Sequence, residues 1–365
     1  MRNFNHYMKT TIAQKYFVKN LLQWNRNDNT RLMPWKGEKD PYKIWLSEVI
    51  LQQTRVKQGL DYYNNFIRHF PTIRKLATAP ETTVFKLWEG LGYYSRCKNL
   101  IATAKYIDIQ LHGKFPDKYD AILALKGIGP YTAAAISSFA FNLPHAVVDG
   151  NVFRVLARYF GIYAATDSTT GKKQFTLLAN ELLDKEEPGI YNQALMDFGA
   201  VICKPKLPLC IKCMLNKNCN AFLNNAVQQL PVKEKSITKK TRWFYYLIIE
   251  LDEKVYVRKR ASKDIWENLY EFFLIEVKVT LLFDNLHIIA DVLGTADFEV
   301  INISPFYKQQ LTHLNIQGQL IRLKISSPLA LNGYDLVSKI ALQKLPFPKF
   351  ISNYLKDKNV SLNLF

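Results

Sequence analysis

Apolar residues recur every three to four positions from residue 10 to about residue 220. The segments 41–70 and 151–160 (NVFRVLARYF) show this spacing clearly. It is the period of a helix that buries one face, so the pattern predicts a mostly helical N-terminal region.

The pattern changes beyond Cys219. Residues 231–242 (PVKEKSITKKTR) are polar and basic, which indicates a linker. The following segment, WFYYLIIELDEKVYVRKR, is rich in β-branched and aromatic residues and predicts two strands joined at Asp252-Glu253. The segments FFLIEVKV, HIIADVL and LIRLKIS continue the strand-like pattern, and a helix is expected near 334–344. The C-terminal third is therefore expected to be a separate α+β domain.

Composition narrows the functional class. The 365 residues carry a formal net charge of +18, and 48% of them are hydrophobic. Such a surplus in a globular chain favours an anionic polymer, above all nucleic acid, over an acidic membrane surface. No apolar run in the sequence approaches the length of a membrane span, and the N-terminus lacks an apolar signal core. We therefore expect an intracellular protein without a membrane partner.

Four of the five cysteines form one cluster with the spacing C-x6-C-x2-C-x5-C. Clustered cysteines in an unexported chain indicate metal ligands, not disulfides. Only one pair has the C-x2-C spacing typical of zinc, which favours an iron–sulfur centre while leaving zinc and buried free thiols as alternatives. Cys97 lies far away and is expected to be a packed core thiol. The predicted ligands are Cys203, Cys210, Cys213 and Cys219.

Residues 121–136 (AILALKGIGPYTAAAI) predict two helices joined by a tight turn. The first helix is expected to end at Lys126, and Pro130 suits the first turn of the second. Gly127 and Gly129 permit a close backbone approach, and free N–H groups at a helix start attract an anion. We expect this hairpin to bind a DNA phosphate, although an ordinary helix–helix turn is the simpler alternative.

Two carboxylates stand in contrasting positions. Asp40-Pro41 predicts a helix start, and Glu48 then lies on the apolar face of that helix, where burial should raise its pKa. Asp149 precedes Gly150 and a helix beginning near Asn151, so it is expected to cap that helix as a charged group. One protonated and one ionised carboxyl is the arrangement used in glycosyl transfer.

Several motifs together resemble the helix-hairpin-helix DNA glycosylases, and within them the adenine DNA glycosylase (MutY) family. They are LKGIGPYTAAAI, VVDGNVFRVLAR, PWKGEKDPYKIWLSEVILQQTRV, GLGYYSRCKNL and the four-cysteine loop. The resemblance covers residues 25–220 and, more weakly, the C-terminal domain. It implies a mainly α glycosylase domain over 1–222, with a six-helix module at about 34–145 and a cluster module from 1–33 and 146–222. A linker over 223–241 and an α+β MutT-like domain over 242–365 complete the expected organisation.

The resemblance implies excision of adenine mispaired with 8-oxoguanine or guanine in double-stranded DNA by a cytoplasmic, DNA-associated monomer. Glu48 would protonate adenine N7, Asp149 would stabilise the sugar cation, and Tyr131 and Asn151 would support them. Related endonuclease III-like enzymes have a lysine where Tyr131 stands, so strand cleavage is not expected. The family implies one 4Fe–4S cluster. An endonuclease III-like glycosylase/lyase and a non-catalytic DNA-damage binding protein are the alternatives.

The resemblance also assigns recognition residues. Met33 replaces a leucine common in relatives, and Phe153 replaces a lysine that the family reaction does not need. The C-terminal segment lacks the acidic signature of nucleotide hydrolases, so lesion reading is its inferred role, with Leu311-Thr312-His313 in place of the family's Phe-Ser-His loop. The expected adenine-pocket residues are Arg31, Met33, Trp35 and Gln193. The expected DNA- and lesion-binding residues are Gln53, Thr54, Leu91, Tyr93, Gly127, Gly129, Thr312 and His313.

Overall fold

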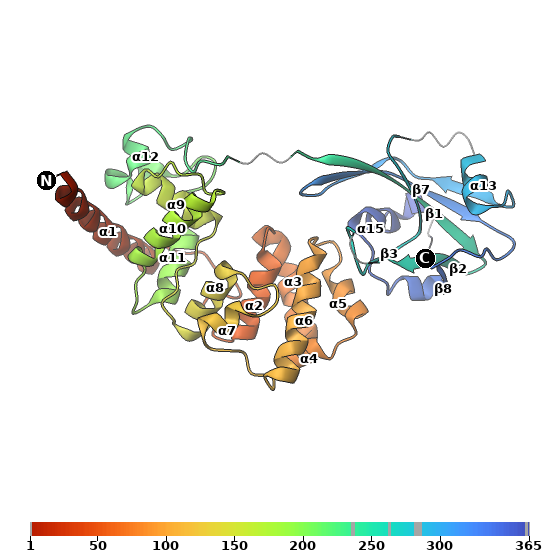
Figure 1. Ribbon diagram of the computed structural model, residues 1–365, viewed down its shortest axis with the longest axis horizontal. Helices are drawn as coiled ribbons and strands as arrows, with labels where there is room; N and C mark the ends of the chain where they lie inside the picture. Colours follow the sequence, from red (N-terminus) through yellow and green to blue (C-terminus); the bar gives the residue numbers. More distant parts are fainter. Residues whose placement is uncertain (1, 235–237, 262–263, 281–286, 362–363, 365) are drawn as a thin grey trace. The chain divides into compact units, whose positions relative to one another are not determined.

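The computed structural model describes residues 2–234, 238–261, 264–280, 287–361 and 364, and only the backbone of residues 2–11. Figure 1 labels the helices and strands of the chain, which divides into two units. The first comprises Met1–Gly59, Phe70–Arg74 and Ala102–Lys235, and the second Leu60–His69, Lys75–Ile101 and Ser236–Phe365. The predicted domain limits at 222/223 and 241/242 stay predictions, and residues 235–237 of the predicted linker lie outside the described residues.

The N-terminal region is helical, as its apolar spacing predicts. None of the described helices combines the length and apolar character that crossing a bilayer requires. The helices are α1 (Arg2–Asn27), α2 (Pro41–Leu51), α3 (Val56–His69), α4 (Ile73–Ala77), α5 (Glu81–Trp88), α6 (Tyr94–Gln110), α7 (Tyr119–Leu123), α8 (Pro130–Phe141), α9 (Gly150–Phe160), α10 (Thr169–Leu182), α11 (Pro188–Val201), η1 (Cys210–Lys212), η2 (Asn216–Asn218) and α12 (Asn220–Leu223).

The predicted hairpin is present between α7 and α8. Gly127 has φ +78°, a left-handed conformation that favours glycine, and Gly129 is the residue before the helix that Pro130 opens. The first helix is shorter than expected: it ends at Leu123 instead of Lys126, because the chain then passes through hydrogen-bonded turns. The amides of Leu125 and Ile128 donate to carbonyls three residues earlier, at 3.1 Å each.

Helices α1, α9, α10 and α11 of the first unit share one hydrophobic core. Phe17 of α1, Leu156 of α9 and Phe198 of α11 are buried in it. Phe153 packs against the same core and meets Phe175 edge to face, with ring centroids 5.1 Å apart. Burial of such side chains, about 1.5–3 kcal/mol each, holds the loops between these helices in place.

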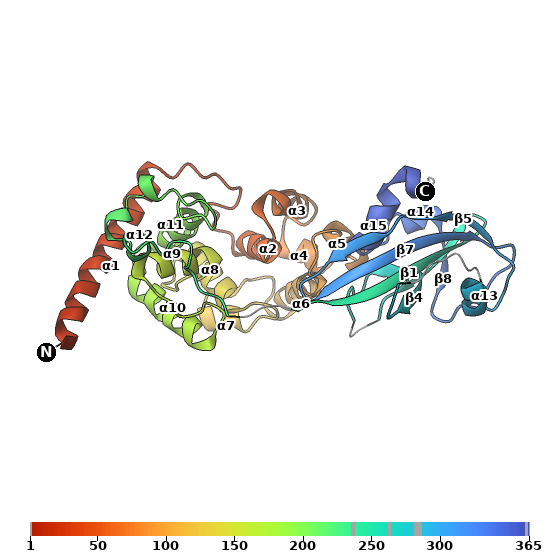
Figure 2. The same cartoon turned by 90° about the horizontal axis from the view of Figure 1, so that it is seen from above.

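The C-terminal region forms an eight-stranded sheet of order β3-β2-β1-β7-β5, in which β4 pairs with β1, β6 with β7 and β8 with β2. β1 and β7 run parallel from Lys240↔Leu314 to Glu250↔Lys324, and Figure 2 shows them side by side. The elements are β1 (Lys240–Leu251), β2 (Lys254–Lys259), β3 (Tyr270–Glu271), β4 (Phe273–Val277), α13 (His287–Leu293), β5 (Glu299–Ile303), β6 (Tyr307–Gln310), β7 (Leu314–Lys324), β8 (Asp335–Ser338), α14 (Lys339–Leu342), α15 (Lys349–Lys356) and α16 (Lys358–Ser361).

Two predictions for this region are wrong. The segment HIIADVL is helix α13, not a strand, because Ile289 and Leu293 bury one face at helical spacing. The helix expected at 334–344 is strand β8 followed by α14, because Val255↔Val337 and its neighbours pair with β2. The strands predicted around the Asp252-Glu253 turn are confirmed as β1 and β2.

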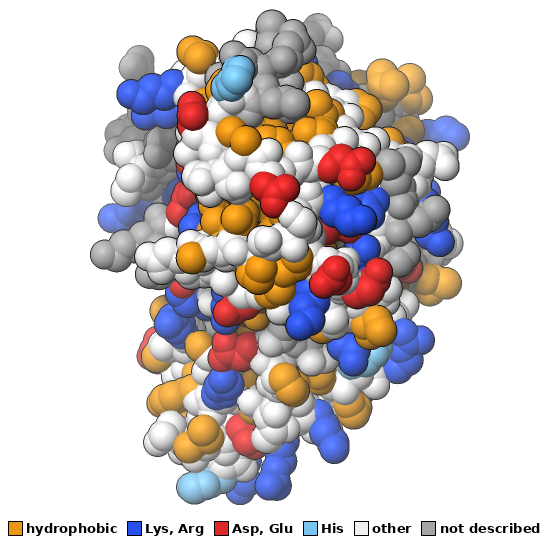
Figure 3. Space-filling model, turned by 90° about the vertical axis from the view of Figure 1, so that its right-hand side faces the viewer, with side chains coloured by type: hydrophobic (Ala, Val, Ile, Leu, Met, Phe, Trp, Pro, Cys, Tyr) orange, Lys and Arg blue, Asp and Glu red, His pale blue; other side chains and the backbone are white. Residues whose placement is uncertain are grey.

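The surplus of positive charge is not spread over every face of the molecule, because one face carries basic and acidic side chains together. In Figure 3, Lys and Arg side chains are interspersed with Asp and Glu side chains over the face shown. Within the sheet, Arg242 lies 2.6 Å from Asp264 and 2.7 Å from Glu276, so a basic residue is matched by acids there. A surface of mixed sign contributes little to the attraction of an anionic polymer.

Candidate functional site

Glu48 is buried on helix α2. The helix begins as predicted, with Asp40 Oδ1 accepting from the Tyr42 amide at 2.9 Å and Pro41 in the first turn. Glu48 is only 6% exposed, and burial raises its pKa to about 7, with the nearby Asp149 charge adding to the rise. A carboxyl with this pKa holds a proton in a substantial fraction of molecules at neutral pH, as a general acid must.

Tyr131 contacts this carboxyl from helix α8. Its hydroxyl donates a hydrogen bond to Glu48, which opposes part of the rise in the pKa of Glu48. Helices α2 and α8 pack together, and Gln52 Nε2 donates to Thr132 Oγ1 at 3.2 Å. The glycine hairpin that opens α8 therefore also fixes the tyrosine against the buried acid.

Asp149 caps helix α9, as expected. Its Oδ1 accepts from the amides of Asn151 and Val152 at 2.8 Å each, and its Oδ2 accepts from Asn151 Nδ2 at 2.7 Å. Burial nevertheless raises the pKa of Asp149, and the hydrogen bonds from these three donors oppose that rise. The position of Asp149 before a helix predicts only the opposing effect. The hydrogen bonds that Asp149 accepts thus stabilise its charged form. For Glu48, which lies nearby, burial instead favours the protonated form.

Asn151 is held in turn by Arg154. Arg154 Nη2 donates to Asn151 Oδ1 at 2.8 Å and to the carbonyl of Gly199 at 2.6 Å, and its Nε donates to the carbonyl of Cys203 at 2.7 Å. Gly199 must be glycine, because a Cβ there would fall 2.7 Å from the Cβ of Asn151. This close approach joins helix α11 to the Asp149 cap.

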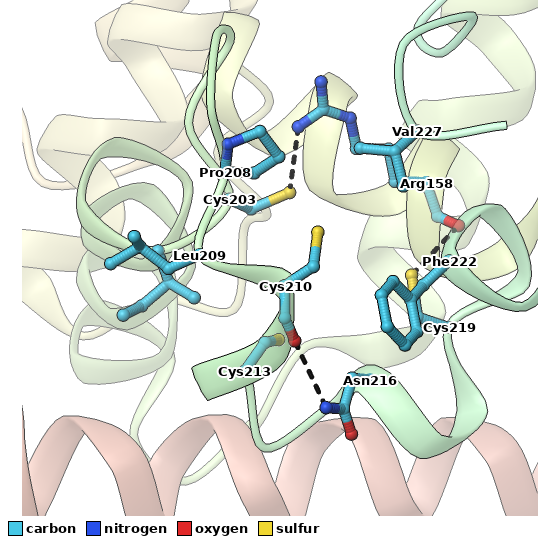
Figure 4. Close-up of a pocket in the computed structure, with 11 residues that line it drawn as sticks. Arg158, Cys203, Pro208, Leu209, Cys210, Cys213, Asn216, Cys219, Phe222 and Val227 are labelled. Carbon is cyan, nitrogen blue, oxygen red and sulfur yellow. Dashed lines mark hydrogen bonds between the residues drawn. The ribbon is translucent and has the colours of Figure 1, made fainter. Parts of the chain in front are cut away.

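The four predicted ligands line one cavity, as Figure 4 shows. None of the four forms a disulfide within the described chain, and burial raises the pKa of Cys213 to about 12. Arg158 is buried beside them, with Nη1 3.5 Å from the sulfur of Cys203. Within the described chain, no three His, Cys, Asp or Glu side chains are grouped closely enough for a single ion. Four thiols around a shared cavity with a neighbouring cation fit a thiolate-bound metal centre in their donor chemistry.

The expected adenine-pocket residues come together only in part. Arg31 and Gln193 both donate to the buried carboxylate of Asp197, at 2.6 Å and 3.0 Å. Met33 and Trp35 lie in the same loop as Arg31 and are half-buried, with their carbonyls accepting from the loop's own amides. Arg31 and Gln193, which are 162 positions apart in the sequence, thus bind the same carboxylate, that of Asp197.

The expected DNA-contacting residues lie at turns. Gln53 and Tyr93 have positive φ values of 55° and 49°, and Thr54 and Leu91 stand beside them. Tyr93 is exposed, whereas Leu91 is buried. Within the second unit, the Tyr93 hydroxyl lies 3.1 Å from that of Thr312. His313 precedes β7, and its carbonyl accepts from the Lys240 amide at 3.1 Å.

Sequence reasoning missed Asp197, Arg154 and Arg158. The two arginines are one turn apart on an otherwise apolar helix, and this spacing was a signal that they share a face with Asn151. Asp197 stands in the apolar segment ALMDFGA, where a charged residue requires a partner. The identity of its partners depends on the fold.

Comparison with known proteins shows which family this chain is similar to. The description "HhH-GPD superfamily base excision DNA repair protein" matches residues 46–180. The adenine DNA glycosylase of Buchnera aphidicola subsp. Baizongia pistaciae is 38% identical over 262 residues, which cover 70% of this chain and 73% of the relative.

Two solved structures are similar to this chain. A thermostable thymine-DNA glycosylase is 31% identical with a TM-score of 0.55, covering 59% of this chain and 99% of its own. A non-covalent endonuclease III–DNA complex, 21% identical with a TM-score of 0.50, covers 58% of this chain and 95% of its own and shares the fold. The motifs, the site geometry and the extent of the match lead to one conclusion: this chain belongs to the adenine DNA glycosylase family of helix-hairpin-helix base-excision repair enzymes.

Proposed function

We propose that this protein removes adenine from double-stranded DNA where adenine is paired with 8-oxoguanine or guanine, and leaves the strand intact. The observation that carries the proposal is the buried Glu48, with its pKa near 7, in contact with Tyr131 and close to the capped Asp149. An acid that donates a proton and a carboxylate that remains charged are the two groups that N-glycosidic cleavage requires.

The reaction breaks one bond and forms one. Glu48 gives its proton to N7 of the departing adenine, and the electron pair of the C1′–N9 bond leaves with the base. The positive charge at C1′ is stabilised by Asp149, whose hydrogen bonds to Asn151 and Val152 fix its orientation. Water then adds to C1′ and loses its proton to a carboxylate, giving free adenine and an abasic site.

Tyr131 favours the monofunctional reaction over the endonuclease III-like alternative. A lyase needs an amine that forms a Schiff base with the sugar, and a phenol cannot form one. The Tyr131 hydroxyl instead donates to Glu48 and orients that acid. Strand cleavage should therefore require added alkali.

One 4Fe–4S cluster is proposed as the resident cofactor. Cys203, Cys210, Cys213 and Cys219 would hold it, and it would supply rigidity to the basic loop between them. The sequence spacing of these thiols, with one C-x2-C pair between wider gaps, supports a cluster over one zinc ion. Arg158 donates hydrogen bonds to the carbonyl of Lys204 within this loop and to the carbonyl of Leu230 beyond it, and so holds the loop's backbone.

The C-terminal sheet is proposed to be MutT-like and to read the opposite base through Thr312 and His313. The turn between β6 and β7 that carries them, with His313 exposed and Thr312 half-buried, supports this role, because a hydroxyl and an imidazole can hydrogen-bond a base edge. The partner is double-stranded DNA and the protein acts as a monomer. A repair activity implies an intracellular, DNA-associated location.

The Glu48→Gln variant tests the catalytic assignment. Glutamine has nearly the same shape but no proton to give, so binding of an A·8-oxoguanine duplex should be retained while single-turnover excision falls by at least about 100-fold. Glu181→Gln is the matched control, because Glu181 is exposed and its carboxylate accepts a hydrogen bond from Gln14 at 3.3 Å, away from Glu48 in the sequence and on another helix. Retained excision in Glu48→Gln would refute the assignment, and absent excision in the wild type would favour a binding protein.

A further inference from the structure

We propose that Asp197 is a positioning residue: it fixes the side-chain amide of Gln193 so that the amide oxygen selects a base carrying a 6-amino group. The inference rests on the proposed function and deepens it, because it names the group that distinguishes adenine from a 6-oxopurine. Asp197 acts through Gln193 and does not itself touch the base.

Asp197 is a fully buried carboxylate with every acceptor position used. Its Oδ1 accepts from Arg31 Nη1 at 2.6 Å and from Gln193 Nε2 at 3.0 Å. Its Oδ2 accepts from Asn29 Nδ2 at 3.0 Å and from Lys36 Nζ at 3.1 Å. A carboxylate offers about four lone-pair sites, so these four donors saturate it. Two of the donors, Arg31 and Lys36, are cations, so the buried carboxylate is paired with opposite charge.

Asp197 decides which end of the Gln193 amide faces it, since Nε2 of Gln193 donates to its Oδ1 at 3.0 Å. A carboxylate only accepts hydrogen bonds, so the amide nitrogen must point toward Asp197 and the oxygen must point away. Across the described chain, no protein donor is paired with the oxygen Oε1 of Gln193. Gln193 is half-buried, so this oxygen is a fixed acceptor open to a ligand.

Helix α11 brings this acceptor near the reacting residues. Met196, adjacent to Asp197, packs with Tyr131 against one small apolar cluster. Two residues beyond Asp197, Gly199 lies against Asn151. The same helix therefore lies against Asn151 and against the apolar cluster on which Tyr131 packs, and it carries Gln193 one turn before Asp197.

A hydrogen-bond acceptor at Gln193 Oε1 distinguishes purines by whether their 6-substituent donates or accepts a hydrogen bond. The 6-amino group of adenine donates a hydrogen bond and would pair with Gln193 Oε1. The 6-oxo group of hypoxanthine is an acceptor, so its lone pairs would face those of Oε1 without a proton between them. An unpaired polar group of this kind is costly, whereas the gain from one neutral pair is modest.

The test is Asp197→Asn in single-turnover excision of adenine and of hypoxanthine, each opposite 8-oxoguanine. Asparagine can both donate and accept, so the Gln193 amide is free to rotate and offer its nitrogen instead. The ratio of the adenine rate to the hypoxanthine rate should fall about tenfold, the size of one hydrogen bond. Comparing the ratio between variants removes the intrinsic reactivity of the two bases.

Three outcomes are distinct. A ratio that falls in Asp197→Asn but not in Glu187→Gln, which breaks only the exposed pair with Arg26 at the start of α11, supports the proposal. Equal losses on both bases would reduce Asp197 to a structural role and overturn it. A wild type that excises adenine from no mispair would refute the proposed function, not the amide orientation alone.

A second variant covers the case in which Asp197→Asn does not fold. In Gln193→Glu, two carboxyls must share one proton to keep their contact. Adenine excision should then show a second loss with rising pH, in addition to the alkaline limb that Glu48 gives to the wild type and to Glu187→Gln. An unchanged pH profile would show that residue 193 does not face Asp197 and would overturn the inference.

Discussion

Glu48→Gln should make the protein more stable while abolishing excision. The pKa of Glu48 rises from 4.5 to about 7 because burial disfavours its charged form. Between these two values the folded state binds more protons than the unfolded state, so this group's contribution to stability falls as the pH rises from 4.5 to about 7. Each pKa unit corresponds to about 1.4 kcal/mol, so the cost above pH 7 approaches about 3 kcal/mol.

Glutamine removes that cost, because it carries no charge and its oxygen can still accept from Tyr131. We expect the variant to be more stable than the wild type by up to about 3 kcal/mol at pH 8, and by much less at pH 5. Urea unfolding at both pH values, with equal cluster loading and with Glu181→Gln as the control, measures the difference. Equal stability of the two proteins at pH 8, or a gain of the same size at pH 5, would refute the reasoning.

Further predictions address the neighbouring groups. Tyr131→Phe removes a hydrogen bond that lowers the pKa of Glu48, so the alkaline limb of the pH–rate profile should move to higher pH; an unmoved limb would contradict that contact. Asp149→Ala should abolish excision and also cost about 0.5–2 kcal/mol in unfolding free energy through the lost cap, whereas an unchanged denaturation midpoint would argue against the cap. Cys213→Ser should eliminate the visible absorption and iron content of the purified protein; retention of both would remove that thiol from the ligand set.

The most predictable features were those set by neighbours in the chain. The Asp40-Pro41 helix start, the Asp149 cap and the glycine hairpin all depend on residues within a few positions of one another. The burial of Glu48 followed from the apolar residues on its own helix. Local chemistry therefore sufficed to nominate both carboxyl groups.

The failures have physical causes. The composition of HIIADVL predicts a strand wrongly, because its isoleucines and valine suit either element, and only the burial of Ile289 and Leu293 on one face identifies a helix. The environment of Asp197 could not be predicted, since its donors Arg31 and Lys36 belong to a loop brought to α11 by the packing of α1. The upward direction of the Asp149 pKa likewise depends on burial by distant segments.

The most direct test of the central claim is single-turnover treatment of a labelled duplex containing adenine opposite 8-oxoguanine, analysed with and without alkali. Duplexes with thymine opposite 8-oxoguanine and with an ordinary A·T pair serve as controls. We expect a strand break at the adenine only after alkali and only in the mispaired duplex, because Glu48 and Asp149 release the base and Tyr131 cannot cut the strand. A break that forms without alkali, or the absence of any break while the duplex is bound, would contradict the account.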